Sequence, residues 1–169
     1  MKRLLSFISV CAFLLTANAE SDAVAFVWDG TGTPTNLRES PRGKVVMSLA
    51  DTCSYIVGIS APINGWWQVD WVEAAEEANS IELTGSPNGK YYIHYSVLGF
   101  GTRNYGSQKL YLRARPSAMS KVKYSFKDER ILRPMETKGD WVKVRTEDKK
   151  HEGWIEWHWI CANPLTTCP

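Results

Sequence analysis

A short string of residues occurs twice in this chain at a fixed offset, and this repeat restricts the possible folds more than any other feature. The stretch 37–41 (LRESP) returns later in the chain as 112–116 (LRARP). Trp66 and Trp141 are separated by the same offset as these two stretches. An offset shared by several landmarks indicates a duplicated structural unit. The chain is therefore predicted to contain two modules that have the same order of elements.

The first 19 residues have the features of a secretory signal peptide. Lys2 and Arg3 precede an apolar run at 4–15, and 17–19 (ANA) fits a small-residue cleavage site. The apolar run is too short to span a bilayer comfortably. The mature chain is therefore expected to start at Glu20, to be exported to the periplasm or the extracellular space, and to contain no membrane span.

The charge of the mature chain argues against a nucleic-acid partner. Removal of the leader takes two of the 20 Lys and Arg residues and none of the 18 Asp and Glu residues, so the formal charge falls to zero. The three histidines form no metal-binding motif, and no residue has an evident catalytic partner. No metal, no cofactor and no enzymatic activity are expected. The histidines are His94, His151 and His158.

Three cysteines remain after the leader and Cys11 are removed. Cys161 and Cys168 lie close together in the sequence, and an exported protein meets oxidising conditions, so a disulfide between them is expected. Cys53 would then be unpaired. Because it lies among strand-forming residues, it is interpreted as a buried small apolar residue and not as a reactive thiol.

The chain is predicted to be all-β, because short runs with a period of two alternate with Gly, Pro, Asn and Ser. In the strand at 66–72, Trp67, Val69 and Trp71 are expected to face the core. The connection after this strand is longer than its counterpart in the second module. The extra residues fall within 73–89, and a loop or a lengthened hairpin is favoured over a helical turn. The predicted strands cover 24–28, 55–59, 66–72, 91–98, 130–133, 141–145 and 153–160.

Each half resembles a bacterial SH3 (SH3b) domain. Three motifs carry the resemblance. The first is a hydrophobic residue followed by Arg, with a Pro and then a Lys-Val pair further along, and the second is a strand of the Gly-x-Trp type. The third is a closing segment, which is seen at 153–160 (GWIEWHWI) and, less closely, at 92–98. The resemblance implies two tandem SH3-like small β-barrels. In the alignment, His94 and Glu156 replace the proline that binds Pro-rich peptides in eukaryotic SH3 domains, so binding in that style is not expected.

The predicted organisation follows from the repeat and the resemblance. Phe100 and Tyr105 are expected to pack between the modules. The predicted parts are a signal peptide (1–19), an N-terminal arm or extra strand (20–34), a first SH3b-like domain (35–100) with the inserted loop 73–89, a linker (101–107), a second SH3b-like domain (108–162) and a C-terminal tail (163–169).

The chain contains eight tryptophans, and aromatic residues are enriched in binding sites. The aromatic residues outside the core are therefore candidates for ligand contact, and Trp157 and Trp159 of the closing segment belong to this wider group. The predicted ligand-binding residues are Trp66, Tyr92, His94, Trp141, Trp154 and Glu156.

These observations favour an exported, non-catalytic binding protein. Its expected partner is a peptide, a peptidoglycan fragment or an envelope protein. An alternative is a periplasmic inhibitor or immunity protein of a secreted enzyme, with the acidic residues of the loop 73–89 entering a basic cleft. Another is a structural component of an envelope assembly. The sequence does not rank these two alternatives.

Overall fold

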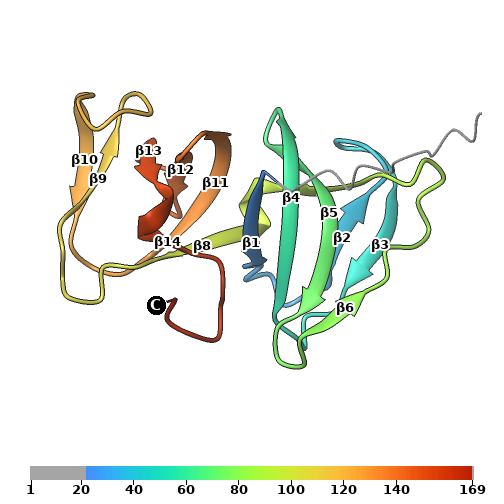
Figure 1. The fold of residues 1–169 in the computed structure, drawn as a ribbon. Coiled ribbons are helices and arrows are strands. Elements are labelled where there is room, and N and C mark those ends of the chain that lie inside the picture. Colours follow the sequence, from blue (N-terminus) through green and yellow to red (C-terminus); the bar gives the residue numbers. More distant parts are fainter. Residues whose placement is uncertain (1–21, 169) are drawn as a thin grey trace, which may run out of the picture.

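The computed structural model describes residues 22–168 and shows an all-β protein (Figure 1). The predicted signal peptide and Cys11 lie outside the described residues. The N-terminal half, here residues 22–97, contains seven strands and one short 3₁₀ helix, η1 (Tyr95–Val97). Its strands are β1 (Ala23–Val27), β2 (Thr35–Arg38), β3 (Val45–Leu49), β4 (Tyr55–Ile63), β5 (Trp66–Ala74), β6 (Asn79–Ile81) and β7 (Tyr91–His94).

The C-terminal half, here residues 103–168, repeats the order of elements from β2 to η1 without a counterpart of β6 and ends in one further strand. The helix η2 (Trp157–Trp159) follows the last long strand, as η1 does in the N-terminal half. The strands are β9 (Leu110–Arg113), β10 (Val122–Phe126), β11 (Ile131–Lys138), β12 (Trp141–Thr146), β13 (Glu152–Glu156) and β14 (Ile160–Cys161).

The two halves pair their strands in the same way. The β2–β3, β4–β5, β5–β7 and β2–β7 pairs have the counterparts β9–β10, β11–β12, β12–β13 and β9–β13. All of these pairs are antiparallel. The register repeats in detail, since Trp66 is opposite His94 and Trp141 is opposite Glu156. The duplication predicted from the sequence is thus present in the strand pairing.

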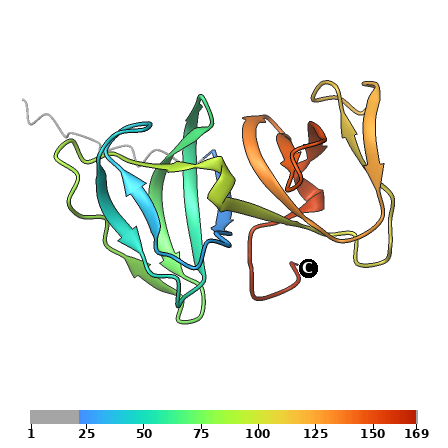
Figure 2. The same ribbon diagram turned by 180° about the vertical axis from the view of Figure 1, so that it is seen from behind.

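One strand, β8 (Leu98–Thr102), joins the two halves (Figure 2). Its first residues pair with β1, and its last residues pair with β11 on one side and β14 on the other. The strand that closes the N-terminal half therefore also begins the sheet of the C-terminal half. Gly101 and Thr102, which the sequence assigned to a linker, lie in this strand. Phe100 is fully buried and its ring packs against that of Trp157, whereas Tyr105 is 41% exposed, so the prediction that Tyr105 packs between the modules is wrong.

Equivalent positions of the repeat form the hydrophobic core. Leu37, Trp67 and Ile93 are fully buried in the N-terminal half, and the residues at the matching positions, Leu112, Val142 and Ile155, are buried in the C-terminal half. Trp67 also links the halves, because its indole N–H donates a hydrogen bond of 3.1 Å to the carbonyl of Pro134. This bond satisfies the polar atom of a ring that would otherwise be costly to bury.

Two features of β5 bear on the sequence predictions. The long connection is an extended hairpin, since β5 pairs with β6 through a turn at 75–78. The prediction that Trp71 is in the core is wrong, because its side chain is 38% exposed. The pairing with β4 shifts by one residue between Val69 and Trp71, and this β-bulge turns Trp71 outward and Val72 inward.

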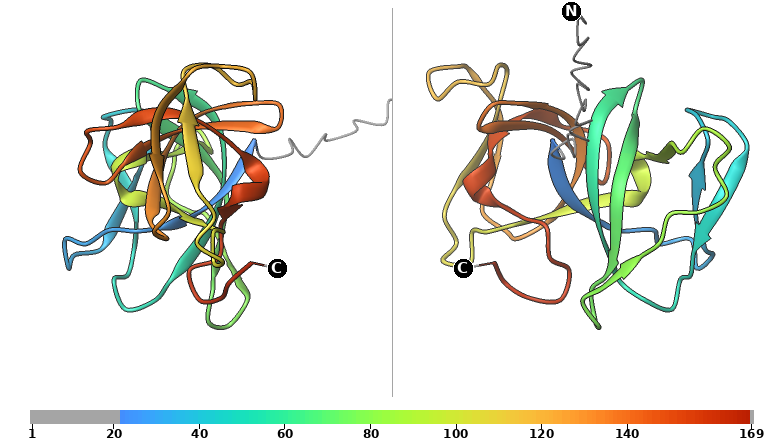
Figure 3. Two further views of the ribbon diagram at one scale, coloured as in Figure 1. Left: turned by 90° about the vertical axis from the view of Figure 1, so that its left-hand side faces the viewer. Right: turned by 45° about the vertical axis from the view of Figure 1, so that its right-hand side comes forward.

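The C-terminal tail is closed by a disulfide between Cys161 and Cys168, the pairing that the sequence favoured. Figure 3 shows the tail running below β8 before it ends. Cys53 lies in the turn between β3 and β4 and is exposed, so the prediction that it is buried is wrong. The turn places it outside the strand whose residues suggested burial.

Candidate functional site

The outer face of β5 and β7 brings aromatic and cationic side chains together. Trp66 and His94 are opposite each other on these strands, and their ring centroids are 5.1 Å apart in an edge-to-face arrangement. The guanidinium of Arg38 lies 5.9 Å from the centre of the Trp66 ring. Such a contact holds a cation over an aromatic face. We call these three residues the aromatic face.

A shallow groove of about 260 Å³ runs beside the aromatic face. The segment between β1 and β2 forms its other wall, and there the carboxylate of Asp29 accepts a hydrogen bond of 2.9 Å from the Thr35 hydroxyl. Val97 also lines the groove. The groove therefore combines apolar rings, a carboxylate and hydroxyl groups, a mixture suited to a ligand with both apolar and hydrogen-bonding parts.

Local hydrogen bonds fix the polar members of the aromatic face. His94 Nδ1 lies 2.7 Å from the Ser96 hydroxyl, and Arg38 donates a hydrogen bond of 2.7 Å to the carbonyl of Gly43. Burial, together with the positive charges of Arg42 and Lys149, lowers the pKa of His94 from its ordinary value of 6.5. At neutral pH the imidazole is therefore uncharged and able to stack or to exchange hydrogen bonds.

The equivalent face of the C-terminal half has a different character. Trp141 is opposite Glu156, and Trp154 is opposite Lys143 on one side and Arg113 on the other. The prediction that Trp154 offers a ligand surface is wrong, because its side chain is only 7% exposed. A ring at the centre of the sheet, between two strands that carry long side chains, is easily covered by their aliphatic stems.

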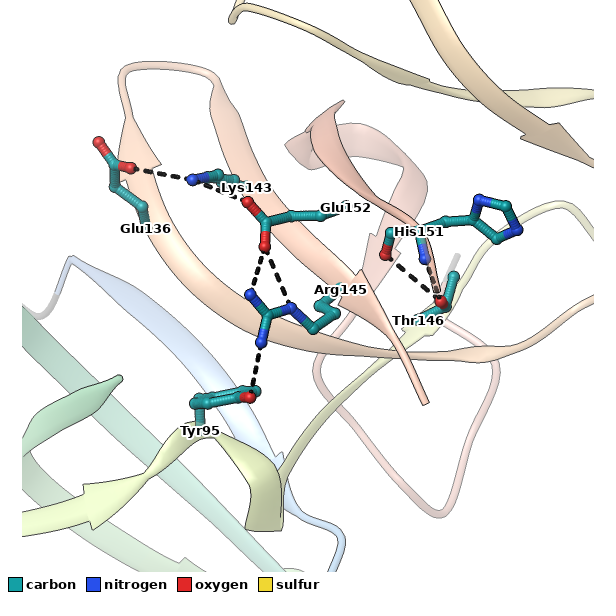
Figure 4. Close-up of polar contacts among 7 residues, drawn as sticks. All are labelled: Tyr95, Glu136, Lys143, Arg145, Thr146, His151 and Glu152. Carbon is teal, nitrogen blue, oxygen red and sulfur yellow. Dashed lines mark hydrogen bonds and ion pairs between the residues drawn. The ribbon is translucent and has the colours of Figure 1, made fainter. Parts of the chain in front are cut away.

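An ion-pair network extends from the C-terminal face to the N-terminal half (Figure 4). Arg145 donates hydrogen bonds to Glu152 and one of 2.8 Å to the Tyr95 hydroxyl of η1. Lys143 binds the other oxygen of Glu152 at 3.0 Å and approaches Glu136 at 4.0 Å. Burial would raise the pKa of Glu152, but the hydrogen bonds from Arg145 and Lys143 outweigh it and lower that pKa.

Tyr95 connects this network to the aromatic face. Its ring centroid lies 4.6 Å from that of His94, while its hydroxyl accepts the hydrogen bond from Arg145. The two faces are therefore linked through one side chain, and Arg145 also lies 5.4 Å from the centre of the Tyr95 ring. This arrangement favours one fixed orientation of the two halves.

The six predicted site residues form two separate sets. Trp66, Tyr92 and His94 lie on the face of the N-terminal half, with Tyr92 opposite Arg38. Trp141, Trp154 and Glu156 occupy the same positions in the repeat of the C-terminal half. Trp157 and Trp159 lie in η2, where Trp157 is half-buried and packs against Phe100 with ring centroids 5.4 Å apart. The helix ends the period of two at this point, so these rings do not extend either face.

Sequence reasoning did not include three residues that the structure places at the site: Arg38, Tyr95 and Arg145. Arg38 belongs to the repeated hydrophobic-Arg pair, so the repeat itself pointed to it. Tyr95 and Arg145 are far apart in the sequence, and only the packing of the two halves brings them together.

The acidic loop of the inhibitor alternative is partly engaged within the protein. The Glu76 carboxylate accepts hydrogen bonds from the Ser54 backbone N–H at 2.9 and 3.1 Å, and Glu77 accepts one from Asn79. The hydrogen bonds from Ser54 lower the pKa of Glu76. At least these two carboxylates therefore stabilise their own hairpin and the turn beside it.

Comparison with protein families identifies the C-terminal half. Residues 109–160 match the family model of the bacterial SH3 domain. The match runs from the start of β9 to the first residue of β14 and includes Trp141, Trp154 and Glu156. No curated protein matches the chain. Residues 109–160 are thus similar to a bacterial SH3 domain, and the N-terminal half shares the strand pairing of this matched segment.

Residues 22–168 lack two features that would point to other classes of function. No group of three or more His, Cys, Asp and Glu side chains in this range is arranged to hold a metal ion. No helix there has the length and the apolar composition needed to cross a membrane. The absence of a metal, a cofactor and an enzymatic activity stays a prediction from the sequence.

Proposed function

We propose that the protein is an exported, non-catalytic binding protein made of two SH3-like modules. The match at 109–160 supports this class for the second module. For the first module the support is the repeated strand pairing, which places Trp66 and His94 where Trp141 and Glu156 lie in the matched module. The ligand is an extended peptide or a peptidoglycan strand.

The observation that carries the proposal is the aromatic face with its groove. Trp66 and His94 are only half-buried although they are large rings, and Arg38 is held beside them by a backbone carbonyl. Rings fixed before binding lose little conformational entropy when a ligand stacks on them. The mature chain has no net charge, so contacts of this kind would dominate over long-range attraction.

The proposal is tested by comparing how strongly the unaltered protein and the variant Trp66→Ala are retained on purified peptidoglycan sacculi. Loss of an aromatic anchor should weaken binding at least about tenfold. The matched control is Trp141→Ala, which removes the tryptophan at the equivalent position of the other module and should leave most of the binding intact. Failure of the unaltered protein to bind sacculi would exclude the peptidoglycan ligand, and equal effects of the two substitutions would exclude the assignment to the aromatic face.

A further inference from the structure

A second and larger groove lies where the two halves meet. It has a volume of about 460 Å³ and is bounded by the end of β1, by β8, by the start of β11 and by the disulfide-closed tail. Figure 1 shows the tail passing below β8 and beside β1. We call this the junction groove. None of the six residues predicted from the sequence to bind a ligand lines it.

Two glycines of β8 shape the floor of the junction groove. Gly99 and Gly101 alternate with Phe100 and so face the same side of the strand. Over Gly99 the space is filled, since an added Cβ would lie 2.6 Å from the Phe26 ring and 3.0 Å from Ile131. Over Gly101 an added Cβ would make ordinary van der Waals contact, because its nearest atom would be the Cys161 carbonyl oxygen at 3.6 Å. The groove therefore has room for a side-chain atom above Gly101 but not above Gly99.

Exposed apolar side chains line the rim. Trp28 is 45%, Tyr105 41% and Leu165 49% exposed, and all three line the same groove. Large apolar side chains gathered at one concave place mark an interaction site more often than scattered ones do. The Trp28 ring is held in position, because its indole N–H donates a hydrogen bond of 2.9 Å to Glu147, which also pairs with Arg133. The Trp28 part of the rim is therefore formed before any ligand arrives.

The charges at the groove favour a cationic group. Arg130 lines the groove, but its guanidinium pairs with Asp128 and hydrogen-bonds the Tyr124 hydroxyl. Glu129 also lines the groove, is exposed, and takes part in no ion pair within residues 22–168. Its carboxylate is thus the unbalanced charge at this site, and it complements a positive group on a ligand.

We propose that the junction groove binds an extended peptide segment. One apolar side chain of the peptide packs over Gly101 between Trp28, Ile131 and Leu165. A Lys or Arg side chain two residues further along the peptide pairs with Glu129. An extended chain turns the side chains of residues i and i+2 to the same face, roughly 6.6 Å apart, which lets one peptide present an apolar group and a positive group to the groove together. This site is separate from the aromatic face, and the proposal stands whether or not that face binds peptidoglycan.

The test uses two synthetic octapeptides as probes and protein purified from expression of the full chain. The peptides are Gly-Ser-Phe-Gly-Lys-Gly-Ser-Gly and the same sequence with Glu in place of Lys. In ¹⁵N–¹H NMR titrations, the Phe-Lys peptide should shift the amide signals of Gly101, Thr102 and Leu165. The Phe-Glu peptide should bind at least about tenfold more weakly, because it places like charges together. No shift at these amides, or equal affinity for the two peptides, overturns the proposal.

Two variants locate the site. Gly101→Leu places a side chain of the protein itself above Gly101, where the peptide's apolar group would pack, and should reduce the affinity at least about tenfold. Its control, Gly30→Leu, places the same side chain at an exposed position with no atom within 4 Å and should change nothing. Glu129→Lys should reverse the preference to the Phe-Glu peptide. Because Glu129 is exposed, this variant keeps the test decisive if Gly101→Leu does not fold, and an unchanged preference overturns the proposal.

The aromatic face provides the last control. In Trp66→Ala the Phe-Lys peptide should still shift the amide signals of Gly101, Thr102 and Leu165 at the same concentrations, whatever happens at the aromatic face, because Trp66 does not line the junction groove. An equal loss in Trp66→Ala would assign the peptide to the aromatic face and overturn the junction site. Loss of sacculus retention in the same variant, with peptide binding intact, would support two independent sites.

Discussion

The two halves of this protein share their strand pairing but differ in what their equivalent outer faces display. In the N-terminal half, Trp66 and His94 leave two half-exposed rings beside a groove. In the C-terminal half, Trp154 is buried, and the network of Lys143, Arg145 and Glu152 occupies the neighbouring positions. The same strand pairing thus supports a surface suited to ligand contact in one half and a surface that holds the halves together in the other.

The register explains how a few substitutions produce this difference. Gln68 and Asp70 of β5 correspond to Lys143 and Arg145 of β12, and Lys90, before β7, corresponds to Glu152. Exchange of one residue type at each position replaces one neutral, one acidic and one basic residue by two cations and a carboxylate that form ion pairs. Since folds host sites without defining them, similar modules in one chain can have different roles.

The largest effect on stability is expected at the core position where the side chains of the two halves differ most in size. Trp67→Ala should lower the free energy of unfolding by about 3–5 kcal/mol, because it empties a buried site and leaves the Pro134 carbonyl without its donor. The equivalent change Val142→Ala should cost only about 2 kcal/mol. Urea denaturation measures both. Equal losses would show that the two cores do not differ in the way their residue sizes indicate.

A smaller effect is expected when the link between the halves is cut. Arg145→Ala should cost roughly 1–2 kcal/mol, because it leaves the half-buried Glu152 with Lys143 as its ion-pair partner and removes the donor to Tyr95. The control Tyr95→Phe removes the hydroxyl alone and should cost about 1 kcal/mol or less. Differential scanning calorimetry of both variants checks this. An unchanged unfolding transition in Arg145→Ala would show that the network does not couple the halves.

Substitutions of Arg38 and Arg113, which occupy equivalent positions in the two halves, should separate effects on stability from effects on binding. Arg38 donates to the Gly43 carbonyl and Arg113 to the Ser120 carbonyl, at 2.7 and 2.9 Å. Arg38→Gln and Arg113→Gln should therefore each cost about 1 kcal/mol in thermal unfolding. Only Arg38→Gln should also weaken retention on sacculi, because only Arg38 lies beside the groove of the aromatic face. Equal effects on retention would contradict the different roles assigned to the two faces.

The smallest effect concerns acid sensitivity. Because the pKa of His94 is lowered in the folded state, the unfolded chain takes up this proton first as the pH falls through the ordinary value of 6.5. Stability should therefore be full above this pH and decrease below it, until the folded-state pKa is passed. The lowered pKa of Glu152 adds a separate loss below its ordinary value of 4.5.

Unfolding midpoints in urea across this pH range separate the two groups. His94→Gln should remove the decrease that starts near pH 6.5, while the decrease below 4.5 remains. A variant that keeps the upper decrease would show that another group is responsible.

The sequence by itself determined the class of this fold and the order of its elements. Two all-β units were predicted from the repeat at a fixed offset, from the period of two and from the paired glycines and tryptophans. The two halves indeed pair their strands in the same order. The sequence also indicated the disulfide of Cys161 with Cys168 and the hairpin in the long connection after β5. These features depend on local spacing, because hydrophobic period and turn residues act over a few positions.

Only the tertiary structure decided which aromatic side chains are available. A one-residue bulge exposes Trp71, a central sheet position buries Trp154, and a turn exposes Cys53. The shared strand β8, the contact of Tyr95 with Arg145 and the junction groove arise from residues far apart in the chain. Burial of a side chain depends on what neighbouring strands place over it, and a one-dimensional pattern does not contain that information.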